Sequence, residues 1–307
     1  MTTVKRDIRK ATGHMVQPKN WFDYVNVLLM LVMMFVMIYP LWFCAVGSFS
    51  EGQDYMRGGV FFWPRTYTWA NYEAIFFDQS ILSAFKVTVL KCVVGTVTSL
   101  LFTSLVSYGM CYPKLRFKNF YIAFIMFTMF FGGGLIPYFL LIQNIGLYDS
   151  FWVYIIPSLF SVWNMIIIQS FMRDLPQALF ESARIDGARE YRIFFQIVIP
   201  LCQPVLAAIA LFTFVGHWNA YFDSMMYTSS QNLQTIQLFL KKVITDPSFS
   251  TSVGASAAAT MPDQAYKVTP HTIKLATMMV TALPVIAVYP FLQKYFVKGV
   301  TIGAVKG

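Results

Sequence analysis

Six long apolar segments divide the sequence, at about residues 24–48, 82–110, 120–142, 151–172, 204–226 and 273–297. A helix needs roughly 20 apolar residues to cross about 30 Å of hydrocarbon, and each segment reaches that length. The pattern therefore predicts an all-α integral membrane protein with six transmembrane helices. In the third segment Gly132, Gly133 and Gly134 precede Pro137, which predicts a break or kink in that helix.

The distribution of Lys and Arg predicts the side on which each loop lies, because cytoplasmic loops carry an excess of cations. With the segment 1–23 placed inside, fifteen Lys and Arg fall in or near cytoplasmic segments and five fall in exterior loops. We therefore expect a transmembrane domain at 24–297 and two cytoplasmic termini, including the tail 298–307. The cationic start leads into the first apolar segment without an Ala-x-Ala pattern, so we expect a retained span there.

Composition agrees with a membrane location, since 57% of the residues are hydrophobic and only 12% are charged. Soluble domains usually have about twice that charged fraction. The net charge of +9 follows the predicted topology, and we expect no nucleic-acid binding. We also expect neither a disulfide nor a metal site, because the four cysteines lie in or beside apolar segments without CxxC spacing.

Two predicted exterior segments, 49–81 and 223–272, are long enough to do more than connect helices. The first is rich in aromatic residues, which prefer the membrane–water interface. In the second, the pattern of 233–243 predicts a short amphipathic helix, and 250–260 consists mostly of small residues that could be mobile or insert into a partner. A structured exterior cap and a partner-contacting loop both fit these residues.

The predicted cytoplasmic loop, 173–203, is polar, charged and helix-forming. Asp174 with Gln177 predicts a capping box and Gly187 a C-terminal stop, which together indicate a helix of about three turns. A second helical piece, 188–196, then leads into the fifth span. The residues alone allow two interpretations: a helix that docks a partner through small and charged side chains, and a surface helix that only places its arginines among lipid headgroups.

Several polar and aromatic residues in the spans have the chemistry of a sugar pathway, in which rings stack on sugar faces and amides bind hydroxyl groups. Helix packing explains the same residues equally well. They are Trp163, Asn164, Gln169, Trp218, Asn219 and Tyr221. Lys91 lies deeper in the second span than Lys86, and it either faces a cavity, where it would attract an anionic sugar such as a uronate, or forms internal hydrogen bonds.

Sequence motifs for catalysis are missing. The chain has no GxxxxGK[ST] run to hold ATP phosphates, no HExxH and no GxSxG. We therefore expect a non-catalytic chain without a cofactor of its own. No apolar segment has a central Asp or Glu, which an ion-coupled secondary transporter usually needs. Such a transporter, and a membrane scaffold that recruits a cytoplasmic partner, are the alternatives to an energised importer.

The loop 173–203 also carries a spaced pattern. Glu181-Ser182-Ala183 is followed after three residues by Gly187 and, after nine more, by Ile197-Val198-Ile199-Pro200. This pattern resembles the EAA loop of bacterial binding-protein-dependent ABC importers, which reads Glu-Ala-Ala, three residues, Gly, nine residues, Ile-x-Leu-Pro. By that resemblance the residues that couple to an ATPase are Glu181, Ser182, Ala183, Arg184, Asp186, Gly187, Ala188, Ile197 and Pro200.

The resemblance extends along nearly the whole chain and is close to carbohydrate-importer permeases of the maltose-transporter type. It implies a type I ABC importer permease in the bacterial cell membrane, which imports a carbohydrate such as an oligosaccharide. The tail 298–307 and Trp63-Pro64 also look like a subgroup linked to complex or uronic-acid-containing oligosaccharides. The implied partners are a second, similar permease, an ATPase dimer that binds ATP and magnesium, and an extracellular solute-binding protein. By the same resemblance 173–203 contains the coupling helix, and 223–272 reaches into the binding protein.

Overall fold

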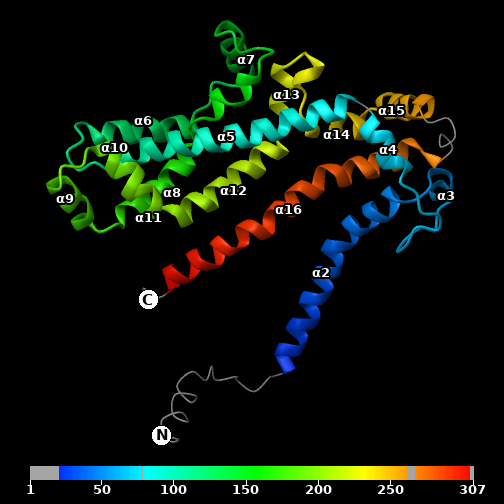
Figure 1. Cartoon of the computed structure of the whole chain (residues 1–307), viewed down its shortest axis with the longest axis horizontal. Helices are drawn as coiled ribbons and strands as arrows, with labels where there is room; N and C mark the ends of the chain where they lie inside the picture. The colour runs from blue at the N-terminus through cyan, green and yellow to red at the C-terminus, as the bar shows by residue number, and fades with distance from the viewer. Residues whose placement is uncertain (1–20, 78, 261–266, 305–307) are drawn as a thin grey trace, which may run out of the picture.

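The computed structural model describes residues 21–77, 79–260 and 267–304, and the regular elements in these ranges are helices (Figure 1). The predicted all-α class is therefore confirmed. An isolated antiparallel bridge joins Ser50 to Tyr67. The five cations expected at the cytoplasmic N-terminus, and Lys306 of the tail, lie outside the described residues.

The central element is α5 (Gln79–Cys111), a helix of 33 residues that runs along most of the molecule (Figure 1). One stripe of α5 is buried and consists largely of small and hydroxyl-bearing residues, among them Gly95, Ser99 and Ser107. Such residues let helices approach closely inside a membrane. Helices α8 (Val162–Arg173) and α12 (Gln203–Asn219) pack against α5, while its apolar remainder is exposed, as contact with lipid requires.

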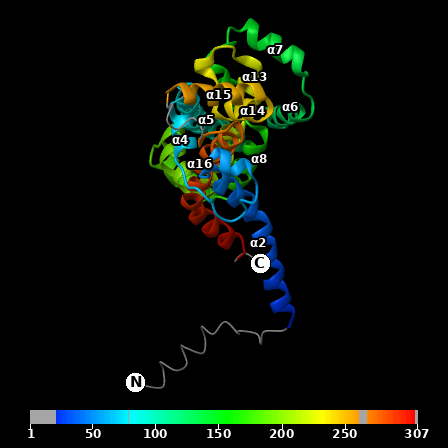
Figure 2. The same ribbon diagram turned by 90° about the vertical axis from the view of Figure 1, so that its right-hand side faces the viewer.

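Helices α2 (Trp21–Ser48) and α16 (Pro270–Ala304) pack against each other. Figures 1 and 2 show α2 leaving the rest of the chain toward its N-terminal end. Residues 21–38 are all exposed, and nearly all of them are apolar. A helix that is apolar on every side needs lipid or another apolar chain around it.

Among the described residues, three unbroken helices are long and apolar enough to cross a membrane: α2, α5 and the part of α16 at Pro270–Val288. Three more crossings are possible if each of three bent helix pairs counts as one span. The pairs are Lys118–Phe130 with Leu135–Asn144, bent by 112°, Phe151–Ser158 with Val162–Arg173, bent by 46°, and Glu190–Leu201 with Gln203–Asn219, bent by 80°. Most of these helices fall on the predicted segments, but Glu190–Leu201 lies in the predicted loop 173–203. The count of six spans stays a prediction.

The predicted break in the third segment is confirmed. Helix α6 (Lys118–Phe130) ends just before the three glycines, and α7 (Leu135–Asn144) begins after Gly134, whose φ is +86°. Glycine takes this conformation without the steric penalty that a side chain brings. The chain therefore turns sharply there, and α7 projects from the body of the molecule (Figure 2).

Two other predicted segments are not continuous helices. Within 151–172 the chain forms short 3-10 turns, η1 (Phe151–Tyr154) and η2 (Ile156–Ser158), before α8. The hydroxyl of Ser161 then accepts a hydrogen bond from the Asn164 backbone at 3.3 Å, which starts a new helix. Within 204–226, α12 ends at Asn219, and α13 (Phe222–Tyr227) follows an extended Ala220.

The described residues of the two segments predicted to be exterior form several helices. Helix α4 (Ala70–Phe77) packs with α14 (Ile236–Thr245), α15 (Pro247–Thr260) and α16 around a shared apolar cluster. The amphipathic helix expected at 233–243 is α14, and the small residues of 250–260 lie in α15. This region thus forms one end of the molecule, here called the α14 end, opposite the α9 end where α9 (Gln177–Ile185) lies (Figure 1).

Asp149 ties the loop after α7 to the loop after α13. Its Oδ1 accepts hydrogen bonds from the backbone N–H groups of Ser229 and Ser230, both at 2.9 Å, and its Oδ2 accepts one from the Ser230 hydroxyl at 2.6 Å. These hydrogen bonds, with the Ser230 hydroxyl first, hold the pKa of the Asp149 carboxyl below its usual value. The residue has φ +54°, a left-handed conformation that Asp and Asn tolerate better than most residues.

Asp149→Ala should therefore release the loop after α13, whereas Asp149→Asn, which keeps one oxygen acceptor and the left-handed preference, should release it less. The measurement is hydrogen exchange at the Ser229 and Ser230 amides, which should be faster in the alanine variant. Because the folded pKa is lowered, the stabilisation is present above the unfolded pKa of about 3.9 and is lost as the pH falls through the folded value. Unchanged exchange in Asp149→Ala would contradict the tie.

Candidate functional site

Helix α9 begins later than the sequence suggested. Its N-cap is Pro176 without a side-chain cap, and Asp174 is instead the C-cap of α8, so the predicted capping box is wrong. Proline explains the shift, because the residue before a proline is disfavoured in helical geometry. Leu175 thus separates two helices, and α9 has nine residues.

The predicted stop at Gly187 is confirmed. Gly187 has φ +77°, and its N–H donates to the Arg184 carbonyl at 3.0 Å, while the Ala188 N–H donates to the Ala183 carbonyl at 2.9 Å. These two bonds form a Schellman motif, in which a left-handed residue ends a helix and reverses the chain. Gly187 thereby sends the chain back beside α9.

The two faces of α9 differ sharply. Phe180 and Ala183 are buried in an apolar cluster with residues of α8 and of the chain after α9. The residues on the outward face are exposed, and Ile185 is 85% exposed. The exposed members of the predicted coupling set are Glu181, Ser182, Arg184, Asp186 and Gly187. An outward face of charged and small residues on an anchored helix is suited to docking a partner.

A hydrogen-bond network holds the reversed chain to α9 and to α5. Glu190 accepts a hydrogen bond from the Arg184 guanidinium at 3.0 Å and another from the Tyr108 hydroxyl of α5. The hydrogen bond to Glu190 raises the pKa of Arg184 above its usual value, so the guanidinium stays charged. The same guanidinium lies over the Tyr112 ring, 5.6 Å from its centre.

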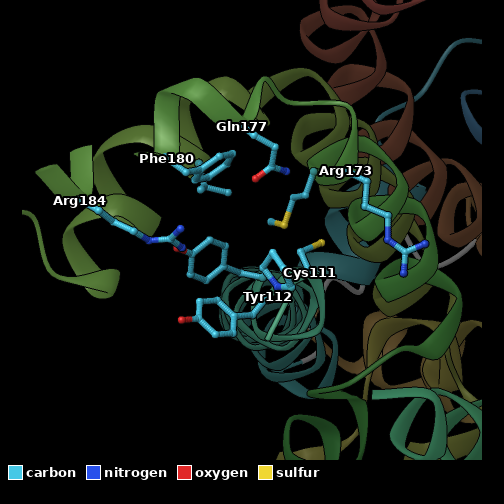
Figure 3. Close-up of a pocket in the computed structure, with 10 residues that line it drawn as sticks. Cys111, Tyr112, Arg173, Gln177, Phe180 and Arg184 are labelled. Atoms are coloured by element: carbon cyan, nitrogen blue, oxygen red, sulfur yellow. The ribbon is translucent and has the colours of Figure 1, made fainter. Parts of the chain in front are cut away.

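Figure 3 shows the small pocket that this network borders. Phe180 and Gln177 of α9 extend over its interior, Arg184 reaches across its mouth toward the tyrosine rings, and Arg173 points away. The pocket holds about 80 Å³, which is enough for a few waters and too small for a sugar. The pocket is therefore a small gap in the packing between α9 and the helices α5 and α8, and not a substrate site.

The chain after Gly187 leads into α12 through three short elements, α10 (Glu190–Ile193), the π-helical turn η3 (Phe194–Val198) and α11 (Ile199–Leu201). Helix α10 and the turn η3 cover most of the range 188–196, where a second helical piece was expected. Ala188 and Ile197 are half-buried and Pro200 is exposed. Ile193, Phe194 and Val198 belong to the same apolar cluster as Phe180, so α9 is packed against the lead-in of α12 as well as against α8.

Lys91 is fully buried in the middle of α5. Its ammonium donates to the Ala220 carbonyl at 3.1 Å, lies 3.6 Å from the Asp223 carboxylate, and lies 4.7 Å from the centre of the Tyr154 ring. Of the two settings considered for this lysine, the structure shows the internal, hydrogen-bonded one. The carbonyl that it binds belongs to the break between α12 and α13.

The three candidate pathway residues around that break have different settings. Trp218 is buried, and its indole N–H donates to the Thr281 carbonyl at 3.0 Å, which is a packing role. Asn219 is exposed and accepts a hydrogen bond from Gln237 at 3.3 Å. Both amides line a cavity of about 400 Å³ whose other walls are mainly apolar residues of α2, α14 and α16. Tyr221 is exposed beneath the Lys241 ammonium, 4.5 Å from the ring centre.

The structure does not bring the other candidates to that place. Gln169 is buried near the α9 end, where its amide donates to the Met110 carbonyl at 3.3 Å. Asn164 donates to the Thr213 hydroxyl at 3.4 Å, and Trp163 beside it is 61% exposed. Of the six polar and aromatic candidates, Asn219 and Tyr221 are the two that adjoin Ala220, whose carbonyl Lys91 binds.

Sequence reasoning missed Tyr108, Glu190 and the Lys91 partners. Glu190 lies six residues after Arg184, a spacing that brings two side chains together only because Gly187 reverses the chain. The Gly187 stop could have suggested that pair. No local signal joins Lys91 to Ala220, which lies 129 residues away.

These features define an all-helical membrane protein with an anchored, outward-facing helix in the loop between two apolar segments. The chain belongs to the family of binding-protein-dependent transport system inner membrane components, which residues 93–302 match.

Relatives and a solved structure agree with this family along almost the full length. The chain is 35% identical over 296 residues to Protein LplC of Bacillus subtilis (strain 168), covering 96% of this chain and 98% of the relative. It is 33% identical over 287 residues to the polygalacturonan/rhamnogalacturonan transport system permease protein YtcP of the same organism, covering 93% and 98%. A chain in the crystal structure of a bacterial ABC transporter involved in the import of the acidic polysaccharide alginate superposes with a TM-score of 0.82 at 30% identity, covering 90% of this chain and 96% of that chain.

The Arg184–Glu190–Tyr108 network predicts energetic coupling between α9 and α5. Tyr108→Phe and Arg184→Ala each remove one contact to Glu190, so a double-mutant cycle in thermal unfolding should give a coupling free energy of about 0.5 kcal/mol at low salt, the lower end of the range for residues in one hydrogen-bond network. The coupling should shrink in about 1 M salt, where the Debye length is about 3 Å. Arg189→Ala, at a neighbouring exposed arginine, is the control. Additive effects of Tyr108→Phe and Arg184→Ala would mean that Glu190 does not connect the two helices.

Proposed function

We propose that this chain is the permease subunit of an ATP-driven carbohydrate importer, in which α9 is the coupling helix that receives force from a separate ATPase. One observation carries the proposal: the inner face of α9 packs against α8 and the lead-in of α12, and Arg184 connects α9 through Glu190 to α5, while Glu181, Ser182 and Ile185 stay exposed. A helix mounted in this way passes a displacement on to the segments that hold it. A free, ordered outer face provides the surface that a partner can push.

The substrate class rests on the relatives. One of them is named as a polygalacturonan/rhamnogalacturonan transport permease, and the alginate importer handles an acidic polysaccharide. The chain imports a carbohydrate, and a further relative, 28% identical and named as an arabinooligosaccharides transport system permease protein, favours an oligosaccharide. The amide pair Asn219–Gln237 and the exposed Tyr221 ring supply the groups that hold sugar hydroxyls and sugar faces.

Four partners complete the proposal. A second, similar permease supplies the other half of the pathway, and the exposed apolar surface of α2 is suited to such a chain or to lipid. Two copies of an ATPase bind ATP and magnesium, and each contacts one coupling helix, either α9 of this chain or its counterpart in the second permease. An extracellular solute-binding protein delivers the sugar to the α14 end, where α14 and α15 present an ordered surface.

The proposed orientation places the α9 end and both termini in the cytoplasm of a bacterial cell. The excess of Lys and Arg in the segments assigned to that side supports it. Closure of the ATPase dimer then moves the two α9 helices together. Because α9 is packed against α8, α10 and η3 and bonded through Glu190 to α5, the spans rearrange as packed blocks and the pathway opens on the other side.

Gly187→Pro should uncouple transport from ATP hydrolysis, because proline fixes φ near −65° where the structure needs +77° and it removes the N–H bonded to Arg184. The measurement is ATP hydrolysis by the reconstituted complex, with and without the sugar-loaded binding protein. Most of the sugar-dependent increase should be lost.

Gly187→Asn is the matched control, since asparagine tolerates the left-handed conformation and keeps the N–H. This variant should retain most of the increase. Full stimulation of the proline variant, in a complex that assembles normally, would rule out the coupling role of α9.

A further inference from the structure

The break between α12 and α13 is the least helical part of the predicted fifth span. Helix α12 ends at Asn219, Ala220 is extended, and α13 begins at Phe222. The last carbonyls of a helix have no partner within the helix. Inside a membrane such groups need a donor from elsewhere in the protein.

Lys91 supplies that donor from α5. An ammonium group carries three N–H donors. The Lys91 ammonium lies 3.1 Å from the Ala220 carbonyl oxygen and 3.6 Å from the Asp223 carboxylate, and it lies 4.7 Å from the centre of the Tyr154 ring. A cation is also favoured at a helix C-terminus by the helix dipole. One side chain thus joins α5 to the end of α12, to α13 and to η1.

Burying a lysine is energetically unfavourable, because a charged group in a membrane segment carries a large desolvation free energy. Methionine or leucine would pack at the same position without that cost. Neither could bond a carbonyl. The presence of lysine at position 91 is therefore explained by its contacts with the Ala220 carbonyl and the Asp223 carboxylate.

The substrate-facing residues flank the carbonyl that Lys91 binds. Asn219 precedes Ala220 and points to the cavity that it lines with Gln237, and Tyr221 follows Ala220 on the surface. A shift of the Ala220 peptide would move both side chains. Lys91 itself is 0% exposed, whereas the Asp223 side chain that covers it is 43% exposed.

The neighbouring packing also depends on the position of this break. His217, one residue before Trp218, is buried against Gly95 of α5, and a Cβ atom at Gly95 would lie 2.7 Å from the His217 ring nitrogen Nε2. Glycine at that position lets the end of α12 approach α5 closely. The close approach brings Ala220 within reach of the Lys91 ammonium.

We propose that Lys91 is a positioning residue for the substrate pathway, which fixes Asn219 and Tyr221 by holding the Ala220 carbonyl across the α12–α13 break. Direct recognition of an acidic sugar by Lys91 is a different role, and its burial beneath Asp223 disfavours that role. The inference about transport rests on the proposed function, while the inference about the break concerns this chain alone.

The break is tested by the reactivity of a cysteine at position 221. In a background with the four native cysteines replaced, Tyr221→Cys is treated with a charged methanethiosulfonate in the detergent-purified protein, with and without Lys91→Met. Methionine has nearly the shape of lysine and no donor. In Lys91→Met the rate of modification at position 221 should change by about threefold or more, because the Ala220 carbonyl then lacks its hydrogen-bond donor and the segment around it is no longer fixed to α5. Lys86→Met, at an exposed lysine of the same helix, should leave the rate unchanged.

A double variant separates the carbonyl bond from charge balance. Lys91→Met with Asp223→Asn removes both charges, so a role in charge compensation alone predicts a normal rate at position 221. The proposal predicts that the altered rate persists. A normal rate in Lys91→Met, or full recovery in the double variant, would overturn it.

Transport kinetics then connect the break to the substrate. In the complex with its ATPase and binding protein, Lys91→Met should raise the half-saturating sugar concentration similarly for neutral arabino-oligosaccharides and acidic galacturonides, whichever the wild type transports. A loss confined to the acidic sugars would instead show direct recognition by Lys91 and overturn the positioning role. If the wild type transports no carbohydrate, the proposed function fails, while the cysteine rates still decide the role of Lys91 at the break.

Discussion

A backbone that leaves helical geometry inside a membrane must find partners for its N–H and C=O groups within the protein. Three of the predicted spans in this chain are broken, after α6, before α8 and between α12 and α13, and the structure depends on how such breaks are satisfied. A serine hydroxyl caps the helix after the break near Ser161, and the Lys91 ammonium holds the break at Ala220. The unbroken α5 supports both places, because α8 and α12 pack against it.

The need to satisfy the backbone at these breaks divides the molecule into packed groups of helices, which specific contacts join. At the α9 end, apolar packing around Phe180 and the Glu190 network join α9 to α8, to the lead-in of α12 and to α5. In the middle of α5, the Lys91 contacts join α5 to α13 and η1. Helices α5 and α12 pack along each other, so they provide the path by which the proposed displacement of α9 would reach the region of Asn219.

Periodicity and turn chemistry predict the local features of this fold well. The apolar segments are mostly helical, although 151–172 and 204–226 are interrupted. The three glycines after Phe131 mark a sharp bend, and Gly187 ends α9 as its position predicts. The start of α9 was mispredicted because Pro176 overrides a possible Asp174 cap. The contacts of Lys91 and Glu190 could not be predicted, since they depend on helix packing between residues far apart in sequence. The spacing of the 181–200 pattern predicts a docking helix where α9 lies, and the chemistry of Asn219 and Tyr221 already marks them as candidate pathway residues. The fold adds that these two residues flank Ala220 at the end of α12.

The central claim is that the outer face of α9 meets an ATPase, and site-specific photo-crosslinking tests it most directly. A benzoyl-phenylalanine in place of Ser182, on the exposed face, should form an adduct with a polypeptide that contains a P-loop when cells expressing the complete transporter are irradiated. The same group in place of Ser229, an exposed residue near the α14 end, should form none with that polypeptide. Adducts with the ATP-binding chain from position 229 and not from position 182 would contradict the account.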